Sequence, residues 1–152
     1  MDKRITCAAF DCFGTVFNAD SLERNLIREY VRHVRQNDFS PFRFPDPWWS
    51  LEPHPDSVEG IRRIQSMSKC VALSNGSKEL LTKLGERAGI RWDHVVDLVS
   101  HRVYKPHGDA YLTVQKDLGI PTDQTVMVTA NPLFGDVEGS ARAGMSPVVI
   151  RN

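Results

Sequence analysis

Residues 5–15 read ITCAAFDCFGT, a short apolar run that ends at Asp11 and is followed by Gly14 and Thr15. A near-continuous apolar run of this length predicts a strand that is buried on both faces, as in a parallel sheet. Ligands of open α/β sheets bind at the carboxyl ends of the strands. Gly14 permits a sharp turn that lets backbone amides face a ligand. The stretch therefore predicts a parallel sheet with Asp11 in its site.

Four more short apolar runs follow, and each predicts a strand: residues 70–73, 95–99, 125–128 and 147–150. Amphipathic stretches between them predict helices over residues 56–64, 77–89, 108–118 and 136–143. We expect a capping box at Asp56 and Glu59, and a second helix capped by Ser77 and ended by Gly89. This alternation predicts the α/β class with a doubly wound, Rossmann-like parallel sheet.

Residues 17–50 interrupt the alternation. Residues 20–37 carry one apolar face, which predicts an amphipathic helix, and four arginines follow roughly the opposite face. Residues 39–55 alternate prolines with bulky rings and predict irregular structure held by aromatic packing. We therefore expect a core made of residues 1–16 and 51–152, with residues 17–50 as an insertion.

The composition is that of an ordinary globular protein of one domain. Of 152 residues, 41% are apolar and 25% are charged, and 19 basic side chains balance 19 acidic ones. This balance favours neither a nucleic acid nor a membrane as partner. No apolar run approaches the length of a membrane span. The spacing of Cys7, Cys12 and Cys70 suits no metal site and predicts buried free thiols in a reducing cytoplasm.

The polar residues at the predicted strand ends form four ordered motifs. The first is D-x-x-G-T at residues 11–15, and the second is Ser74-Asn75-Gly76. Lys105 with Tyr111 six residues later makes the third, and residues 129–131 followed by Asp136 make the fourth. In this order the motifs resemble those of the haloacid dehalogenase (HAD) superfamily of aspartate-nucleophile hydrolases. The resemblance covers about residues 5–16 and 51–152.

The resemblance implies a role for each matching residue. Asp11 would be the nucleophile, Thr15 would orient it, and Lys105, held by Asp136, would neutralise charge around it. Cys12, Phe13, Ser74 and Asn75 would contact a small anionic substrate. Tyr111, Thr129 and Asn131 would help to place the hydrolytic water.

Phe13 favours the 2-haloacid dehalogenase branch. Phosphatases of the superfamily carry a second Asp at this position as general acid, and a phenyl ring cannot donate a proton. A halide leaves without a proton, so the dehalogenase branch needs no such acid and no cofactor. Asn131 also departs from the paired carboxylates that hold Mg²⁺ in phosphatases. The five-residue gap from Asn131 to Asp136, however, is a phosphatase-like spacing.

Two alternatives stay open at this point. One is a Mg²⁺-dependent phosphatase with a degenerate acid, in which the metal position would involve Asp11, Phe13, Asn131 and Asp136. The other is a non-catalytic binding module, which an exposed apolar patch at Trp48 and Trp49 would favour. HAD dehalogenases carry a helical cap of domain size, whereas residues 17–50 allow only a reduced one. An open site of this kind would need a partner subunit to exclude water, so a homo-oligomer is expected.

Overall fold

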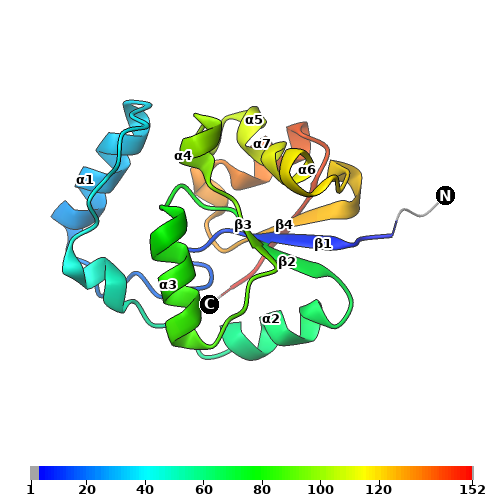
Figure 1. The fold of residues 1–152 in the computed structure, drawn as a ribbon, viewed down its shortest axis with the longest axis horizontal. Coiled ribbons are helices and arrows are strands. Elements are labelled where there is room, and N and C mark those ends of the chain that lie inside the picture. The colour runs from blue at the N-terminus through cyan, green and yellow to red at the C-terminus, as the bar shows by residue number, and fades with distance from the viewer. Residues whose placement is uncertain (1–3, 152) are drawn as a thin grey trace.

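The computed structural model describes residues 4–151 as one five-stranded parallel sheet with helices on both faces (Figure 1). The strands are β1 (Cys7–Phe10), β2 (Lys69–Ala72), β3 (His94–Val95), β4 (Thr125–Thr129) and β5 (Ser146–Val149). Their order in the sheet is β3-β2-β1-β4-β5, and all neighbours run parallel. The predicted doubly wound α/β class is therefore confirmed, with the strand that leads to Asp11 in the centre.

Helices cover both faces of the sheet, as Figure 1 shows. Their bounds are α1 (Arg24–Arg35), α2 (Ser57–Gln65), α3 (Lys78–Ala88), α4 (Leu98–His101), α5 (Gly108–Tyr111), α6 (Thr113–Leu118) and α7 (Asp136–Arg142), with 3₁₀ turns at Asp46–Ser50 (η1), Thr122–Gln124 (η2) and Pro132–Phe134 (η3). Strand side chains alternate between the two faces. Ala8 and Phe10 of β1 pack with α2 and α3, whereas Cys7 and Ala9 pack with α4, α5 and α6.

The third strand is shorter than predicted. Only His94 and Val95 form β3, and the run 95–99 does not continue as a strand. The chain instead enters α4 at Leu98, because the Asp97 carboxylate accepts a hydrogen bond from the Ser100 backbone N–H at 3.3 Å. An Asp at this position favours a helix start over a longer strand.

Two helix predictions also need correction. The helix expected over residues 108–118 is divided into α5 and α6 at Leu112. The capping box at Asp56 is wrong: Asp56 has a helical backbone, and its side chain makes no cap hydrogen bond. The prediction for α3 is confirmed, because the Ser77 hydroxyl accepts from the Leu80 N–H and Gly89 ends the helix with φ of 82°.

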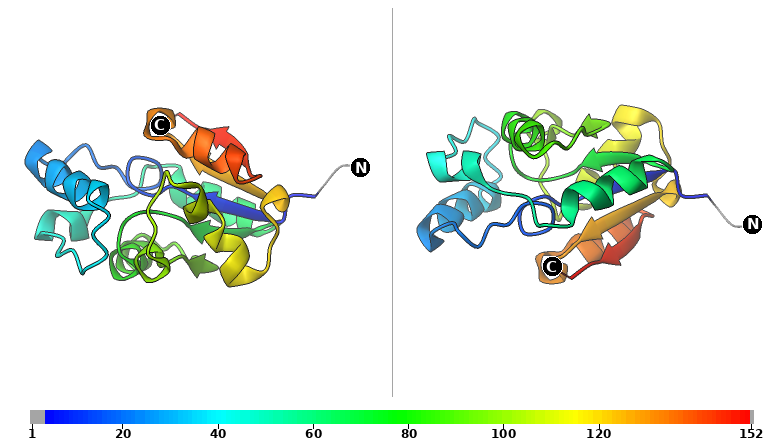
Figure 2. Two further views of the ribbon diagram at one scale, coloured as in Figure 1. Left: turned by 90° about the horizontal axis from the view of Figure 1, so that it is seen from above. Right: turned by 90° about the horizontal axis from the view of Figure 1, so that it is seen from below.

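Residues 17–50 leave the core and return to it at one place. Phe17 bridges to Pro53, and the Asn18 N–H donates to the Glu52 carbonyl at 2.8 Å. The segment between carries α1 and η1 and lies at the carboxyl ends of the strands, to the left of the sheet in Figure 1 and again in both views of Figure 2. No residue of α1 is fully buried, so the helix lies on the surface.

The aromatic side chains of this segment pack against each other. Trp48 is 2% exposed, and its ring centroid lies 5.0 Å from Phe13, 5.1 Å from Tyr30 and 5.1 Å from Phe44. The Trp49 indole N–H donates to the Phe44 carbonyl at 2.9 Å. The rings therefore hold the 17–50 segment to the first motif, and Trp48 contributes nothing to an exposed apolar patch.

The three cysteines are buried and free, as predicted. Burial raises the pKa of Cys7 to about 11 and that of Cys70 to about 12. Thiols with these pKa values stay protonated and unreactive at neutral pH. Within residues 4–151, none of the helices has the length and apolar character needed to cross a bilayer.

Candidate active site

Asp11 follows β1 directly and is held by side chains from three other positions. The Thr15 hydroxyl and the Asn131 amide both donate to Oδ2 of Asp11, each at 2.8 Å. The Lys105 ammonium donates to Oδ1 at 3.1 Å. The Asp11 side chain keeps 13% of its surface exposed. It is therefore an oriented carboxylate at a strand end that is still open to solvent.

Lys105 lies between two carboxylates. Its Nζ is 3.1 Å from Asp11 and 3.2 Å from Asp136, and its side chain is only 7% exposed. Burial alone lowers the pKa of Lys105, but the adjacent charges of Asp11 and Asp136 outweigh this effect and raise the pKa above 10.5. Lys105 is therefore a fixed cation at every pH at which the protein would work.

Tyr111 completes this cluster from the other side. Its hydroxyl donates to Oδ1 of Asp136 at 2.7 Å. Burial raises the pKa of Tyr111, and the Asp136 charge raises it further, so the hydroxyl remains a donor. Asp136 therefore receives hydrogen bonds from both Lys105 and Tyr111. A carboxylate occupied in this way orients Lys105 and is poorly suited to abstract a proton itself.

The second motif holds the backbone of the third. The Asn75 side chain accepts from the Lys105 N–H at 2.7 Å and donates to the Lys105 carbonyl at 3.0 Å. Ser74 is 2% exposed, and its hydroxyl accepts a hydrogen bond from the Gly76 N–H at 3.1 Å. The two motifs meet although 30 residues separate Asn75 from Lys105 in the sequence.

The fourth motif closes against the first. The Asn131 amide also donates to the Phe13 carbonyl at 3.0 Å, and the Asn131 N–H donates to Thr129 Oγ1 at 3.0 Å. Gly14 has φ of 85°, and a Cβ at this position would lie 3.0 Å from the Asn131 amide nitrogen. Two features therefore require glycine at this turn: the left-handed backbone and the close approach of Asn131.

Two predicted residues, Cys12 and Thr129, are fully buried and make no hydrogen bond with Asp11. Cys12 is fully buried in the core, and its thiol lies 3.6 Å from the Phe10 carbonyl. Any contact between Cys12 and a substrate would have to come from its backbone. Thr129 is likewise fully buried, and its hydroxyl accepts a hydrogen bond from the Asn131 N–H. The Phe13 ring belongs to the aromatic cluster around Trp48.

Tyr30 of α1 is a site residue that the sequence did not indicate as one. Burial raises the pKa of Tyr30 well above 10.0, the nearby Asp11 charge raises it further, and a hydrogen bond with the Ser74 side chain lowers it in part. Tyr30 thus brings a neutral hydroxyl from the 17–50 segment to the second motif. Its only sequence signal was a place on the apolar face of the predicted helix, which any packed tyrosine would share.

The residues of the possible Mg²⁺ position do not fit a hard cation. Phe13 offers no side-chain oxygen, and Asn131 turns its amide N–H groups toward Asp11 and the Phe13 carbonyl. The Lys105 ammonium already lies between the carboxylates of Asp11 and Asp136. Mg²⁺ needs several oxygen ligands around one point. Among residues 4–151, no group of three or more His, Cys, Asp or Glu side chains is placed to hold a metal ion.

A sequence model of the family described as haloacid dehalogenase-like hydrolase matches residues 46–144. The chain belongs to this family. The match contains the second, third and fourth motifs, and the prediction of a HAD-superfamily hydrolase is confirmed at this level.

Curated relatives of this HAD-like chain are dehalogenases by name. An (S)-2-haloacid dehalogenase of Xanthobacter autotrophicus is 32% identical over 98 residues, which are 63% of this chain and 38% of the relative. Haloacetate dehalogenase H-2 of Moraxella sp. (strain B) is 30% identical over 108 residues, 69% of this chain and 47% of the relative. The chain therefore matches less than half the length of each of these two proteins.

Solved structures share the fold of this HAD-like chain. The L-2-haloacid dehalogenase of X. autotrophicus with chloropropionic acid covalently bound has a TM-score of 0.79 at 23% identity, over 96% of this chain and 77% of that chain. A family enzyme of Bacteroides thetaiotaomicron in complex with magnesium and inorganic phosphate has a TM-score of 0.70 at 13% identity, over 97% and 94%. Because a dehalogenase and an enzyme bound to magnesium and phosphate share this fold, the fold alone does not decide the chemistry.

Proposed function

We propose that this HAD-like hydrolase cleaves carbon–halogen bonds of small 2-haloacids, with Asp11 as nucleophile. The observation that carries the proposal is the arrangement of donors around Asp11. Thr15, Asn131 and Lys105 all donate to its carboxylate, which fixes its orientation, and the side chain still keeps 13% of its surface exposed. The names of the curated relatives support the same chemistry.

The reaction proposed for this site has two steps. A carboxylate oxygen of Asp11 attacks the carbon that bears the halogen, the carbon–halogen bond breaks, and the halide leaves with the electron pair. Water then attacks the carbonyl carbon of the resulting Asp11 ester. The ester bond breaks, the hydroxy acid leaves, and the Asp11 carboxylate is restored with release of a proton. Neither step needs an acid at Phe13 or a metal.

The other residues of the cluster have supporting roles in this proposal. Lys105 neutralises charge as the substrate carboxylate approaches Asp11, and Asp136 with Tyr111 fixes the position of Lys105. Ser74 lies at the end of β2, where it would contact the substrate carboxylate, and Asn75 holds the Lys105 loop. Tyr111, which we expected to place the water, would act through Asp136.

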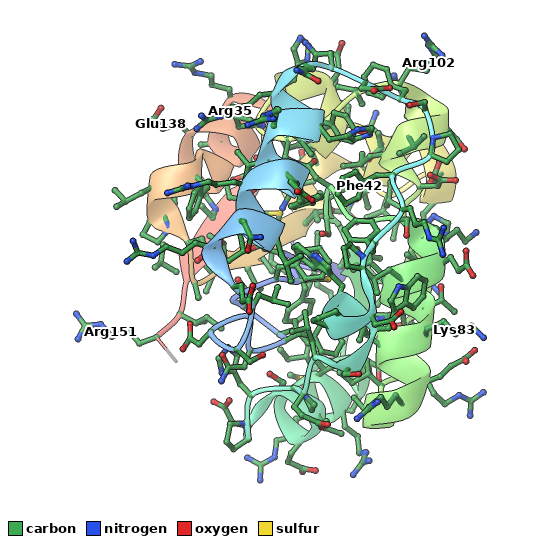
Figure 3. The ribbon with its side chains drawn as sticks, turned by 90° about the vertical axis from the view of Figure 1, so that its left-hand side faces the viewer. Arg35, Phe42, Lys83, Arg102, Glu138 and Arg151 are labelled. Carbon is green, nitrogen blue, oxygen red and sulfur yellow. The ribbon has the colours of Figure 1, made fainter. Side chains whose placement is uncertain are left out.

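We also propose that residues 17–50 form a reduced cap over Asp11. Two ring contacts support this role: the Phe13 ring centroid lies 5.9 Å from Tyr30 and 5.0 Å from Trp48. A cavity of about 530 Å³ lies beside the site between this segment and the core, with Tyr30, Phe42, Asn75 and Tyr104 in its wall. Figure 3 shows Phe42 between the loop of the segment and α1, where its ring packs against Tyr30 and His33. Closure by a second subunit remains a prediction.

The experiment compares halide release and phosphate release on panels of 2-haloacids and phosphate esters, with and without Mg²⁺. We expect halide release that does not depend on Mg²⁺ and that falls about 10⁴-fold or more in Asp11→Asn. Circular dichroism of Asp11→Asn serves as the control for the fold. Halide release that survives in Asp11→Asn would contradict the nucleophile assignment. Mg²⁺-dependent phosphate release would favour the phosphatase alternative, and no release on either panel would favour a binding module.

A further inference from the structure

A second cavity, of about 380 Å³, lies between the 17–50 segment and the loop that leads to Lys105. Asn37 and Phe39 line it from the segment, and Arg102, His107 and Lys116 line it from the core. Its wall includes neither Asp11 nor Asp136, so it is a different place from the candidate active site. We call it the basic cavity.

The charges of the basic cavity have one dominant sign. Arg102 and Lys116 are exposed, and neither forms a salt bridge with any residue in the described part of the chain. Two histidines, His101 and His107, add further basic groups, and Asp109 is the only acidic residue in the wall.

Both histidines already have acidic neighbours. His101 Nε2 lies 2.8 Å from the Asp117 carboxylate, and His107 Nδ1 lies 3.9 Å from that of Asp109. The fixed positive charge of the basic cavity therefore comes from Arg102 and Lys116.

The backbone is left-handed on both sides of this cavity. Among residues 4–151, Asn37 with φ of 51° and Arg102 with φ of 56° are the non-glycine residues in the left-handed region. Both line the basic cavity, one from each side. A left-handed backbone is unfavourable for a side chain such as arginine, and strain of this kind concentrates at binding sites.

The strained backbone places the Arg102 side chain beside the 17–50 segment. Its guanidinium carbon lies 5.4 Å from the centroid of the Phe39 ring. Phe39 in turn stacks on Tyr104 at 4.8 Å, and the Tyr104 hydroxyl donates to the Asp38 carbonyl at 2.6 Å. Figure 3 shows Arg102 at the edge of the molecule, next to the loop of the segment. The guanidinium is thus held in place before any ligand arrives.

We infer that the basic cavity binds a phosphate group. Arginine and lysine present only N–H donors, and the planar arginine fork matches the oxygens of phosphate. The volume admits a phosphate with a small substituent. A bound phosphate would contact the 17–50 segment and the core at once, three residues before Lys105, and would steady the segment over Asp11. This binding does not depend on the proposed dehalogenase reaction.

The test is a titration with inorganic phosphate at constant ionic strength, in which calorimetry and ³¹P NMR measure binding. We expect Arg102→Gln and Lys116→Gln to weaken binding by about tenfold or more each, because a charge-assisted hydrogen bond is lost in each variant. Lys83→Gln is the matched control, since Lys83 is an exposed lysine on α3 that Figure 3 shows pointing away from the molecule. It should bind like the unchanged chain. Arg102→Lys, which keeps the charge but loses the fork, should fall between.

The other outcomes overturn the inference. One is failure of phosphate to bind the unchanged chain, and another is binding to Arg102→Gln and Lys116→Gln with full affinity. A third result would be binding that survives in both variants but is lost in Ser74→Ala, which would place the phosphate beside Asp11. Circular dichroism of each variant separates loss of binding from loss of fold. Because Asp11→Asn leaves the basic cavity intact, it should retain phosphate binding even though turnover is lost.

Discussion

The carboxyl ends of the strands and the 17–50 segment are built by different physical means. At the strand ends, Asp11, Lys105 and Asp136 are joined by charged hydrogen bonds of 3.1 and 3.2 Å, and their side chains are at most 13% exposed. In the 17–50 segment, α1 has no buried residue, and the anchors are aromatic rings around Trp48. The strand ends are therefore held by a charged hydrogen-bond network, and the 17–50 segment is held by apolar packing.

The strand ends hold the candidate catalytic side chains, whereas the 17–50 segment packs beside them. The parallel sheet positions Asp11, because Asp11 directly follows β1, whose register is set by β2 and β4. The 17–50 segment packs the Tyr30 ring against Phe13 of the first motif. Changes at the strand ends should therefore affect turnover most, and changes in the segment should affect stability or substrate binding.

The largest effect is expected at Lys105. Lys105→Met keeps the length of the side chain but leaves Asp11 and Asp136 facing each other without a cation. We expect turnover to fall by at least about 10³-fold and the free energy of unfolding to fall by about 3 to 5 kcal/mol. Halide release and urea unfolding measure the two losses. Lys83→Met on the exposed face of α3 is the control, and an equal effect in both variants would refute the special role of Lys105.

A large loss of stability is expected at Trp48. Trp48→Ala removes a ring that is 2% exposed and contacts Phe13, Tyr30 and Phe44. The free energy of unfolding should fall by about 3 to 5 kcal/mol. Arg28→Ala, on the exposed side of the same segment, should change it by less than about 0.5 kcal/mol. Urea unfolding compares the two, and a small loss at Trp48 would mean that the segment is not anchored by its rings.

A moderate effect is expected at Tyr30. Tyr30→Phe keeps the ring and its contacts with Trp48 but removes the hydroxyl that interacts with Ser74. We expect kcat/KM to fall about tenfold, as for the loss of one hydrogen bond, with little change in unfolding. Steady-state kinetics on 2-haloacids measure the effect. Unchanged kinetics would show that Tyr30 only packs.

The smallest effect concerns pH. The pKa of Lys105 in the folded chain lies above 10.5, because the Asp11 and Asp136 charges outweigh burial. The stability that Lys105 contributes should therefore be fully present below pH 10.5 and should be lost as the pH rises through the higher pKa of the folded chain. Urea unfolding from pH 8 to 11 tests this, with Lys105→Met as a reference that should lack the alkaline loss. A loss that already begins near pH 8 and is absent from Lys105→Met would contradict the raised pKa.

The sequence predicted the features that depend on short-range pattern. The strands before Asp11, Ser74 and Thr129 are present, as are the α3 cap at Ser77 and its end at Gly89. Each depends on apolar runs or on a capping residue within a few positions. The four motifs also meet at one edge of the sheet, because parallel strands present their carboxyl ends on the same side.

Two of the features that the sequence did not predict have local causes, and one depends on a distant partner. Residues 95–99 have the composition of a strand, but Asp97 starts α4 after only two residues of pairing. Asp56 fits the capping-box spacing, yet its backbone is already helical and its side chain makes no cap bond. Tyr30 has the pattern of a packed helix residue, and its partner Ser74 is 44 positions away. Local pattern carries no information about such contacts.

The two hydrogen bonds between the Asn75 side chain and the Lys105 backbone also affect how this protein degrades chemically over time. Asn75 is followed by Gly76, and an Asn-Gly pair deamidates readily because glycine does not hinder attack of its backbone nitrogen on the asparagine side chain. In the folded chain that nitrogen donates to Ser74, and the Asn75 amide is bonded to the Lys105 backbone. The folded structure should therefore slow deamidation at Asn75-Gly76. A molecule that unfolds for long enough to deamidate would return with a carboxylate at Asn75, which cannot donate to the Lys105 carbonyl.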